Sequence, residues 1–474
     1  MKISLRHPQH LCLLVVLLGC EATSQTFTTL YTFSGTDGAN PYSGLIVSNG
    51  TLYGTTRFGG DADSGTIFAL NLNGGGLTSL HNFSGGHDGA SPFSGLVSSG
   101  NALFGVTTSG GDSRSGNLFR VNTDGSGFVV LHTFGPADQP YFTNTDGGYS
   151  HAKLALSGDT LYGTAFYGGV YGNGTVFSIK TDGTAFATLH HFTGGSDGAN
   201  PFAGLILSGT TLYGTASQGG DGPNGTVFKL NVDGTGFATL YGFTQTYQYS
   251  GNTNLDGASP QAALLLSSNT LYGTANFGGN TGKGTVFALG TDGTGFTVLH
   301  HFAGSSTNGD GAFPQAALIL LDNTLYGTAG YGGQSSGVIF QVNTDGTGFA
   351  TVHRFISTNE GSVPTGDLVL AGSALCGTTS LGSSSGHGTV FSLSLPVQPL
   401  GLAISHDTPT AAGPDGANVI LTWPNSGTAL KLQSATNLAS PIWTSISQVP
   451  VVINGLNTVT NLNSSPQQFY RLSQ

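Results

Sequence analysis

The stretch GLILSGTTLYGTASQGGDGPNGTVFKLNVDGTGFATLYGF, residues 204–243, decides the fold of this chain. It contains four short runs rich in aliphatic, aromatic and Thr residues, which begin at Gly204, Thr211, Gly225 and Phe237. Clusters of Gly, Asn and Asp separate these runs, as turns separate strands. The last two runs are joined by DGTG, a tight hairpin connection in which Gly accepts a positive φ. The stretch therefore predicts a sheet of four antiparallel strands.

This unit occurs seven times. The tetrad LYGT and its variants place a residue at Tyr53, Phe104, Tyr162, Tyr213, Tyr272, Tyr326 and Cys376, at intervals of 51, 58, 51, 59, 54 and 50 residues. The third run, GTVF and its variants, ends at Phe68, Phe119, Phe177, Phe228, Phe287, Phe340 and Phe391. Sheets too small to be stable alone bury their faces against their neighbours. The repeat predicts an all-β protein with a seven-bladed β-propeller over residues 25–395.

The two ends of the repeat array are complementary. The array begins with FTTLYTF at 27–33, a fourth strand without the first three, and its last unit has strands one to three without a fourth. We expect the N-terminal strand to complete the last blade, because that pairing removes two open sheet edges.

The flanking segments differ from the repeats. Residues 1–24 carry Lys2 and Arg6, an apolar run over 11–18 and then small residues, which is the order of a secretory signal peptide. The alternative is a lipoprotein attached through Cys20, since LLGC resembles a lipoprotein box. Residues 396–401 are expected to be a linker. Residues 402–474 hold both tryptophans in strand-like runs and resemble the small C-terminal β-sandwich modules of other exported proteins.

The composition excludes several classes of protein. Only 7% of the residues are charged, and the 12 Lys and Arg stand against a net charge of −11, so nucleic acid is not expected as a partner. No transmembrane segment is expected in the mature chain, which would hold Cys376 as its single cysteine. We expect a secreted or cell-envelope protein that is a monomer.

The units resemble two known kinds of repeat. Their order of strands is similar to that of Kelch blades, although Phe stands where Kelch has Trp in strand four. The closer resemblance is to the GloVer tandem-repeat family of exported bacterial proteins, whose copies carry LYGT, GTVF and DGTGF as they stand here, over residues 27–395. The resemblance implies a propeller and export, and it implies no particular activity.

Two sets of polar residues recur in the repeats. In strand four one position holds His or Tyr between Phe residues, which favours a flat ring with one hydrogen-bonding tip over a metal ligand. Asp182 and its equivalents lie in the DGTG hairpin and are expected to bond turn amides, while a set of acidic residues precedes strand one. If strand one is innermost, these acids would surround one end of the propeller axis and could bind a cation such as Ca²⁺, with repeated turn-forming residues as the alternative. The acids are Asp37, Asp88, Asp146, Asp197, Asp256, Asp310 and Glu360. No other cofactor is expected.

The third repeat departs most from the pattern. It follows the longest insertion, 135–151, and has His151 and Lys153 where other units have an aromatic residue and Gly. Tyr141, Phe142 and Tyr149 could stack on a sugar or on a partner side chain, with His151 and Lys153 as polar anchors, or the insertion packs on a neighbouring blade. Strand alternation places the variable loops, those joining strands two to three and four to one, on a single face, which is where binding usually occurs.

Three functions follow from these patterns. The first is a non-catalytic exported scaffold that binds a glycan or a surface protein on the variable-loop face. The second is a propeller hydrolase or lyase acting on polysaccharide, for which Glu occurs only twice and most carboxylates lie in repeated turns. The third is a structural protein of the cell envelope.

Overall fold

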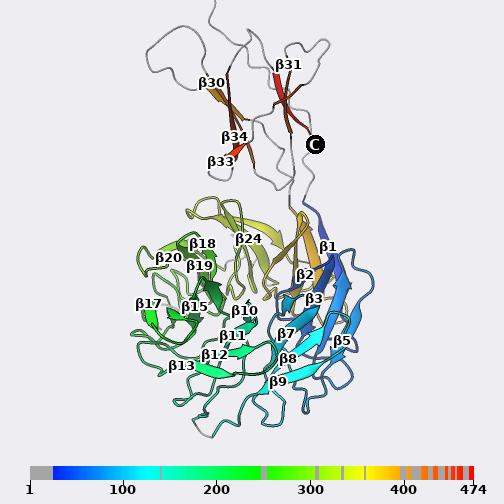
Figure 1. Ribbon diagram of the computed structural model, residues 1–474, viewed down its shortest axis with the longest axis vertical. Coiled ribbons are helices and arrows are strands. Elements are labelled where there is room, and N and C mark those ends of the chain that lie inside the picture. The colour runs from blue at the N-terminus through cyan, green and yellow to red at the C-terminus, as the bar shows by residue number, and fades with distance from the viewer. Residues whose placement is uncertain are drawn as a thin grey trace, which may run out of the picture. The chain divides into compact units, whose positions relative to one another are not determined.

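The computed structural model describes residues 25–138, 141–246, 253–304, 309–332, 336–356 and 359–395, together with short strands between 403 and 473 (Figure 1). The expected signal peptide and linker lie outside the described residues. Residues 26–394 form one unit, and the segment from 395 onward belongs to another. Every regular element in the described part of the chain is a strand, and none of it is a helix long and apolar enough to cross a membrane.

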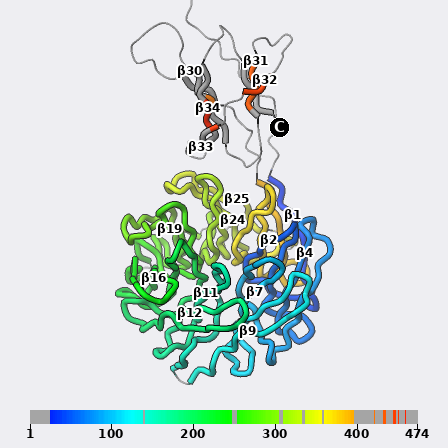
Figure 2. Tube along the Cα trace, in the orientation of Figure 1, coloured from blue at the N-terminus to red at the C-terminus, as the bar shows by residue number. Residues whose placement is uncertain are grey.

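The unit of residues 26–394 is a seven-bladed β-propeller, as the repeat predicts (Figures 1 and 2). Each blade is an antiparallel sheet of four strands in sequential order, except that the seventh takes its fourth strand from the N-terminal segment. Strands β2 (Ile46–Ser48), β6 (Val97–Ser99) and β26 (Val369–Ala371), which begin blades one, two and seven, contact one another in neighbouring pairs and are therefore innermost.

The strands have the following bounds. Blade one comprises β2, β3 (Thr51–Thr56), β4 (Thr66–Asn71) and β5 (Thr78–Asn82), and blade two comprises β6, β7 (Ala102–Thr107), β8 (Asn117–Asn122) and β9 (Val129–Thr133). Blade three comprises β10 (Ala155–Ser157), β11 (Thr160–Ala165), β12 (Thr175–Lys180) and β13 (Ala187–His191), and blade four comprises β14 (Ile206–Ser208), β15 (Thr211–Ala216), β16 (Thr226–Asn231) and β17 (Ala238–Gly242). Blade five comprises β18 (Leu265–Ser267), β19 (Thr270–Ala275), β20 (Thr285–Gly290) and β21 (Thr297–His301), and blade six comprises β22 (Ile319–Leu321), β23 (Thr324–Ala329), β24 (Val338–Asn343) and β25 (Ala350–Arg354). Blade seven comprises β26, β27 (Ala374–Thr379), β28 (Thr389–Ser394) and β1 (Phe27–Thr32).

The motifs LYGT and GTVF are explained by one cross-strand pair. Gly214 in β15 is the register partner of Phe228 in β16, and the Phe228 side chain is completely buried. A Cβ atom on Gly214 would lie 2.6 Å from Cζ of Phe228, so the ring occupies the space above the glycine. The other blades repeat this contact, and the glycine of LYGT is therefore a packing requirement of the Phe in GTVF.

The hydrophobic core is divided among the junctions between blades. Tyr162 and Phe192 of blade three pack with Leu212 and Phe228 of blade four in one buried cluster. Equivalent clusters fill the other junctions, including one that joins Phe33 beside β1 and Phe68 of blade one to Cys376 of blade seven. Each blade is thus stabilised by burial against its neighbours.

The first and last strands of the propeller unit pair with each other. β1 lies antiparallel to β28, with Phe27 opposite Leu393 and Thr32 opposite Thr389.

From residue 395 onward the described strands form two small antiparallel sheets. One has the order β29 (Ala403–His406), β30 (Asn418–Pro424), β34 (Leu456–Leu462), β33 (Val451–Ile453), and the other β32 (Thr444–Ser445), β31 (Lys431–Ala435), β35 (Phe469–Ser473).

Candidate functional site

The loops that join strands two to three and those that join strands four to one lie together, and we call this side of the propeller the loop face. Isolated β-bridges connect the two sets of loops within each blade, as between Gly148 and Tyr167 in blade three. Many exposed large hydrophobic side chains of the described residues belong to these loops: Tyr141, Val170, Tyr171, Leu255, Phe277, Tyr331, Ile356 and Leu381. The loop face is therefore the side of the propeller with apolar side chains available for contact.

Seven residues with a left-handed backbone lead from the loops into the first strands. They are Asn40, Ser91, Tyr149, Asn200, Ser259, Phe313 and Val363, with φ between 53° and 59°. Asn and Ser tolerate this conformation, whereas it is uncommon for an aromatic or β-branched residue such as Tyr149, Phe313 or Val363. Six of the seven precede a proline, and Ser150 follows Tyr149. This turn fixes the backbone of the residue that comes two positions later.

The seven residues that stand two positions after these left-handed residues form what we call the axial ring: Tyr42, Phe93, His151, Phe202, Gln261, Gln315 and Thr365. Tyr42 stacks on Phe93 at 5.0 Å, and His151 stacks on Phe202 at 4.6 Å between ring centroids. Phe93 of blade two also contacts Phe202 of blade four at 5.6 Å, across the intervening blade. Such a contact is possible because these side chains point toward the propeller axis. Blades one to four thus contribute aromatic rings to the axial ring, and blades five to seven contribute amides and a hydroxyl.

A second group of rings continues from the axial ring toward the insertion of blade three. His151 meets Phe166 edge-on at 5.3 Å, and Phe166 meets Tyr167 at 4.6 Å. Tyr167 then stacks on Phe142 at 4.9 Å and meets Tyr149 edge-on at 5.8 Å. We call the eight rings from Tyr42 to Phe142 the aromatic band: Tyr42, Phe93, Phe202, His151, Phe166, Tyr167, Tyr149 and Phe142. The band brings together three of the five residues expected from the sequence, Phe142, Tyr149 and His151.

The two other expected residues lie beside the band. Tyr141 precedes Phe142 and is 77% exposed, with no ring contact among the described residues. Lys153 lies two residues after His151 and two residues before β10. The positions equivalent to Lys153 are Gly44, Gly95, Gly204, Ala263, Ala317 and Asp367. Lys153 and Asp367 are thus the two charged side chains in a ring of otherwise small residues.

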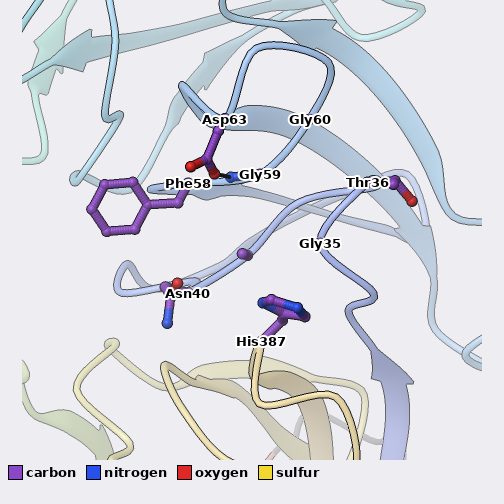
Figure 3. A pocket seen from close by; sticks show the side chains of 9 residues that line it. Gly35, Thr36, Asn40, Phe58, Gly59, Gly60, Asp63 and His387 are labelled. Atoms are coloured by element: carbon purple, nitrogen blue, oxygen red, sulfur yellow. Dashed lines mark hydrogen bonds between the residues drawn. The ribbon is translucent and has the colours of Figure 1, made fainter.

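Arg57 connects the aromatic band to a pocket. Its guanidinium lies over the rings of Tyr42, Phe93 and Phe58, at 5.5, 5.4 and 4.8 Å from their centroids. Phe58 lines a pocket of about 540 Å³ at the seam between blades seven and one (Figure 3). We call it the seam pocket, and its lining also includes Thr36, Asn40, Asp63 and His387.

Burial of His151 sets its charge. Desolvation, together with the positive charge of Arg57, lowers the pKa of His151 to about 4, despite a hydrogen bond to the backbone of Tyr149. The imidazole is therefore neutral at physiological pH, and its buried Nδ1 has no hydrogen-bond partner in the described structure. Asn276, 2% exposed, donates to Gln261 of the axial ring at 3.3 Å, while its own Oδ1 is also buried without a partner.

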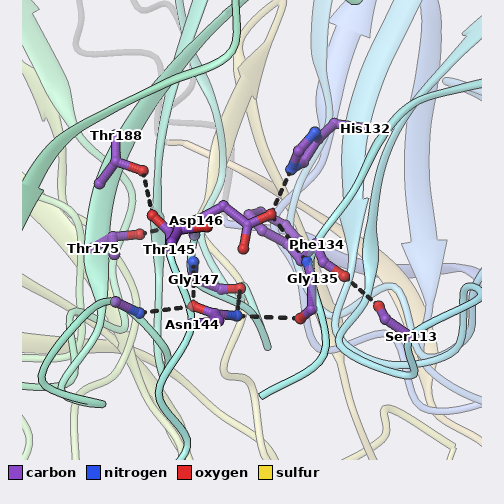
Figure 4. Close-up of polar contacts among 11 residues, drawn as sticks. Ser113, His132, Phe134, Gly135, Asn144, Thr145, Asp146, Gly147, Thr175 and Thr188 are labelled. Atoms are coloured by element: carbon purple, nitrogen blue, oxygen red, sulfur yellow. Dashed lines mark hydrogen bonds and ion pairs between the residues drawn. The ribbon is translucent and has the colours of Figure 1, made fainter. Parts of the chain in front are cut away.

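The seven acidic residues before strand one do not face one another. Each approaches the His or Tyr in strand four of the preceding blade, as Asp146 Oδ2 approaches His132 Nε2 at 3.0 Å (Figure 4). The same carboxylate accepts the backbone N–H of Gly135 at 2.9 Å. The equivalent pairs are Tyr31 with Asp37, His81 with Asp88, His190 with Asp197, Tyr241 with Asp256, His300 with Asp310 and His353 with Glu360. Within the described part of the chain, no three His, Cys, Asp or Glu residues come close enough together to hold a metal ion.

The His or Tyr of each pair also joins two blades. The ring of His132 in blade two stacks on Phe186 of blade three at 3.9 Å and 7°. Five further rings stack in the same way, as Tyr241 does on Phe296, whereas blade one has Leu77 at this position and Tyr31 makes no such stack among the described residues. The expected flat slot is confirmed, but one of its Phe residues comes from the DGTGF motif of the next blade rather than from the same strand. Period-two alternation within one strand could not reveal that partner.

The hairpin aspartates behave as the sequence predicts. Asp182 accepts hydrogen bonds from the backbone N–H and the hydroxyl of Thr184, at 2.9 and 2.6 Å. Asp124, Asp233, Asp292 and Asp345 make the same pair of bonds in their hairpins. These residues are turn-forming and exposed.

Sequence reasoning missed Tyr42, Phe93, Phe202, Phe166 and Arg57 as parts of one site. The signal was present in the comparison of equivalent positions. Aromatic residues follow the proline in blades one, two and four, and Gln or Thr follows it in blades five to seven. If this position served only to pack the blades, the same kind of residue would be expected in all seven blades, so the division between aromatic and polar residues indicates another role.

The comparisons with known proteins concern the fold and the repeat. The model of the Gloeobacter/Verrucomicrobia repeat matches residues 17–141, 138–254 and 242–428. No curated protein matches the chain in sequence. Among solved structures, a putative 6-phosphogluconolactonase from Bacteroides uniformis is similar at a TM-score of 0.44 and 15% identity, over 69% of this chain and 87% of that one.

Two other solved structures are similar at the same level. They are a puromycin-hydrolyzing peptidase from Mycobacterium tuberculosis, at a TM-score of 0.45 and 12% identity over 84% of this chain, and a puromycin hydrolase, at 0.48 and 13% over 82%. The matches span 61% and 59% of those two chains. At these levels none of the solved structures bears on what this chain binds or does.

Proposed function

This chain belongs to the Gloeobacter/Verrucomicrobia repeat family, and from that premise we propose that it is a non-catalytic binding scaffold that holds a glycan on its loop face. The binding site is the aromatic band together with the polar half of the axial ring. The residues that the seven units share build the ring of blades, and the residues that differ between the units form the binding site.

The single observation that supports a glycan is the division of the axial ring. Sugar rings have apolar faces that stack on aromatic side chains, and hydroxyls that need hydrogen-bonding groups at their edges. Tyr42, Phe93, His151 and Phe202 offer the first kind of surface. Gln261, Gln315 and Thr365, which are partly exposed, offer the second. The two surfaces lie on opposite sides of one ring, so one sugar residue could contact both.

A glycan array with the purified chain tests this proposal. Replacing Phe202 by Ala removes a stacking platform and should weaken binding to the glycans that score positive by tenfold or more. Phe277→Ala is the matched control, because Phe277 lies on the same face, is 42% exposed and is not part of the aromatic band. A chain that bound no glycan on the array, or one whose binding was unchanged by Phe202→Ala, would contradict the proposal.

A reducing-sugar assay on the same glycans separates binding from turnover. We expect no new reducing ends over a long incubation with the ligands that bind. Release that is abolished in Phe202→Ala but retained in Phe277→Ala would instead support the polysaccharide hydrolase or lyase.

We further propose that the chain is exported, closed by β1 and extended by a C-terminal β-sandwich. The β1–β28 pairing and the two small sheets after residue 395 support the last two points. Export rests on the sequence of residues 1–24 alone. Protease protection of the chain in intact cells, with and without residues 1–24, tests whether that segment directs it out of the cytoplasm.

A further inference from the structure

We propose that the glycan is acidic, and that Lys153 and Arg57 bind the carboxylate of a uronic acid residue seated on the axial ring. This inference rests on the proposed function, and it names the class of sugar that the site takes. Three observations carry it: the placement of Lys153, the placement of Arg57, and the unpartnered polar atoms behind the axial ring.

The side chain of Lys153 extends from blade three toward Gly95 of blade two, which has no side chain of its own. A Cβ atom on Gly95 of blade two would lie 3.5 Å from Cδ of Lys153, so the lysine stem passes this glycine at van der Waals distance. Lys153 follows His151 by two residues, and its stem lies beside Gly95 of the blade that carries Phe93. In the described structure its ammonium has no carboxylate within 4 Å and no hydrogen-bond partner. Lys153 is partly buried as a residue, and its unpaired ammonium is available to an anion.

Asp367 is the other charged residue among the positions equivalent to Lys153, and it is held elsewhere. It lies against Gly44 of blade one, where a Cβ atom would be 2.6 Å from Cβ of Asp367. Its Oδ1 accepts the backbone N–H of Ala317 at 2.7 Å, which directs the carboxylate to blade six. The two charged side chains of this ring are therefore held apart, and Lys153 remains available.

Arg57 supplies the second positive charge. Its guanidinium lies over Tyr42 and Phe93, and, like Lys153, it has no carboxylate within 4 Å among the described residues. The chain has only 12 Lys and Arg and a net charge of −11, and Arg57 is the one of them whose guanidinium lies over rings of the aromatic band in the described structure. Stacked arginine is preorganised, and it can donate two parallel hydrogen bonds to a carboxylate.

The hydroxyl groups of such a sugar have partners in place. His151 Nδ1 and Asn276 Oδ1 are buried and lack hydrogen-bond partners in the described structure. Asn276 is 2% exposed and bonds Gln261, so it stands directly behind the polar half of the axial ring. Buried polar atoms are ordinarily satisfied, so a ligand hydroxyl that displaced the side chains covering these atoms would complete their hydrogen bonds.

The test compares three trisaccharides by titration calorimetry with the full chain: trigalacturonate, its fully methyl-esterified form, and a neutral cellotriose. The expected result is that trigalacturonate binds at least tenfold more tightly than the other two. Its affinity should fall as salt is raised from 50 to 500 mM, while the affinities of the uncharged sugars should change little.

Variants then assign the carboxylate to its ligands. Lys153→Gln and Arg57→Gln should each weaken binding of trigalacturonate by roughly tenfold, while binding of its methyl ester is unchanged. Lys180→Gln is the matched control, because Lys180 carries the same charge but pairs with Asp159 in the turns opposite the loop face. Lys153→Arg keeps the charge and should retain most of the affinity. Melting temperatures of all variants show that each is folded.

Each outcome separates this inference from the proposed function. Equal binding of the acidic and esterified sugars, or no loss in Lys153→Gln and Arg57→Gln, overturns the acidic ligand and leaves a neutral-glycan scaffold intact. Absence of binding by all three sugars, together with a negative glycan array, overturns the proposed function itself.

Discussion

His190 Nε2 lies 3.1 Å from Asp197 Oδ2, and the same imidazole stacks at 3.8 Å on Phe237 of the next blade. One side chain therefore joins strand four of blade three both to the loop that begins blade four and to the outer strand of blade four. The Asp197 carboxylate also accepts the backbone N–H of Thr193 at 2.9 Å. The repeated acid and the repeated His or Tyr are two ends of one contact, which holds neighbouring blades together.

Replacing Asp197 by Ala should destabilise the propeller. His190 Nε2 and the Thr193 amide would lose their acceptor in a partly buried place, at a cost of about 1–3 kcal/mol in the free energy of unfolding. Chemical denaturation measures this loss. Asp182→Ala is the control, since Asp182 makes its two bonds in an exposed hairpin, and its replacement should cost less. Equal stability of Asp197→Ala and the unmodified chain would contradict the role of this contact.

Acid should weaken the same contacts. Burial lowers the pKa of His81, His190 and His353 below 6.5, although their acidic partners act in the opposite direction. The unfolded chain then binds more protons than the folded chain, so stability is complete above pH 6.5 and decreases as the pH falls below it. For His151, the lowering of the pKa from 6.5 to about 4 contributes about 3 kcal/mol to the free energy of unfolding. This contribution is lost as the pH falls from 6.5 to about 4.

The pH dependence can be reduced by exchange of the ring. His190→Tyr should keep the stack and the hydrogen bond, as Tyr241 does with Asp256 at 2.8 Å, and it removes one titrating group. Melting temperatures of the variant between pH 7 and pH 4.5 should fall less than those of the unmodified chain. A steeper fall in the variant would show that the imidazoles do not govern the acid sensitivity.

Calcium should not stabilise the chain through the acids that precede strand one. Six of them pair with a strand-four His or Tyr at 3.3 Å or less, and His300 with Asp310 at 3.5 Å, so each acid has a partner within its own junction. The melting temperature should be the same in 5 mM Ca²⁺ and in chelator. A rise with Ca²⁺ that disappears in Asp146→Asn would restore the cation hypothesis for this set of residues.

The glycine of LYGT should tolerate no side chain. In Gly214→Ala the new methyl would lie 2.6 Å from Cζ of the buried Phe228, and relief of that overlap should cost about 1–3 kcal/mol. Gly242→Ala is the control, because nothing lies within 4 Å of its Cβ position. The double variant Gly214→Ala with Phe228→Leu should recover part of the loss if the overlap is its cause. Equal destabilisation of the two single variants would contradict this reason for the motif.

The sequence predicts the blades well because their signals are local. Strand runs, hairpin turns and the seven-fold spacing lie within about 50 residues of each other, and the structure places β14 to β17 within one or two residues of the runs in 204–243. The contacts between blades could not be predicted in this way. Phe237 stacks on His190 across a junction, and Phe93 meets Phe202 across a whole blade, so both depend on the closed ring rather than on any strand pattern.

The candidate site was predicted in part for the same reason. The departure of repeat three from the pattern pointed to Phe142, Tyr149, His151 and Lys153, which the sequence shows as a cluster. Arg57 comes from blade one and Phe202 from blade four, and only the propeller axis brings them near His151. Comparison of equivalent positions around the ring, rather than along one unit, would have found them.

Removal of β1 should open the ring. β1 pairs with β28 along its length, and Phe33, which follows it, is completely buried with Phe68 of blade one and Val390 of blade seven. A chain that begins after residue 33 would expose the edge of β28 and the apolar side chains of this junction. We expect a lower melting temperature and concentration-dependent association in analytical ultracentrifugation. Phe33→Ala in the intact chain separates the two contributions, since it leaves the strand pairing in place and should lower stability by about 3–5 kcal/mol without causing association. An unchanged melting temperature of the truncated chain would show that the other junctions hold the ring without β1.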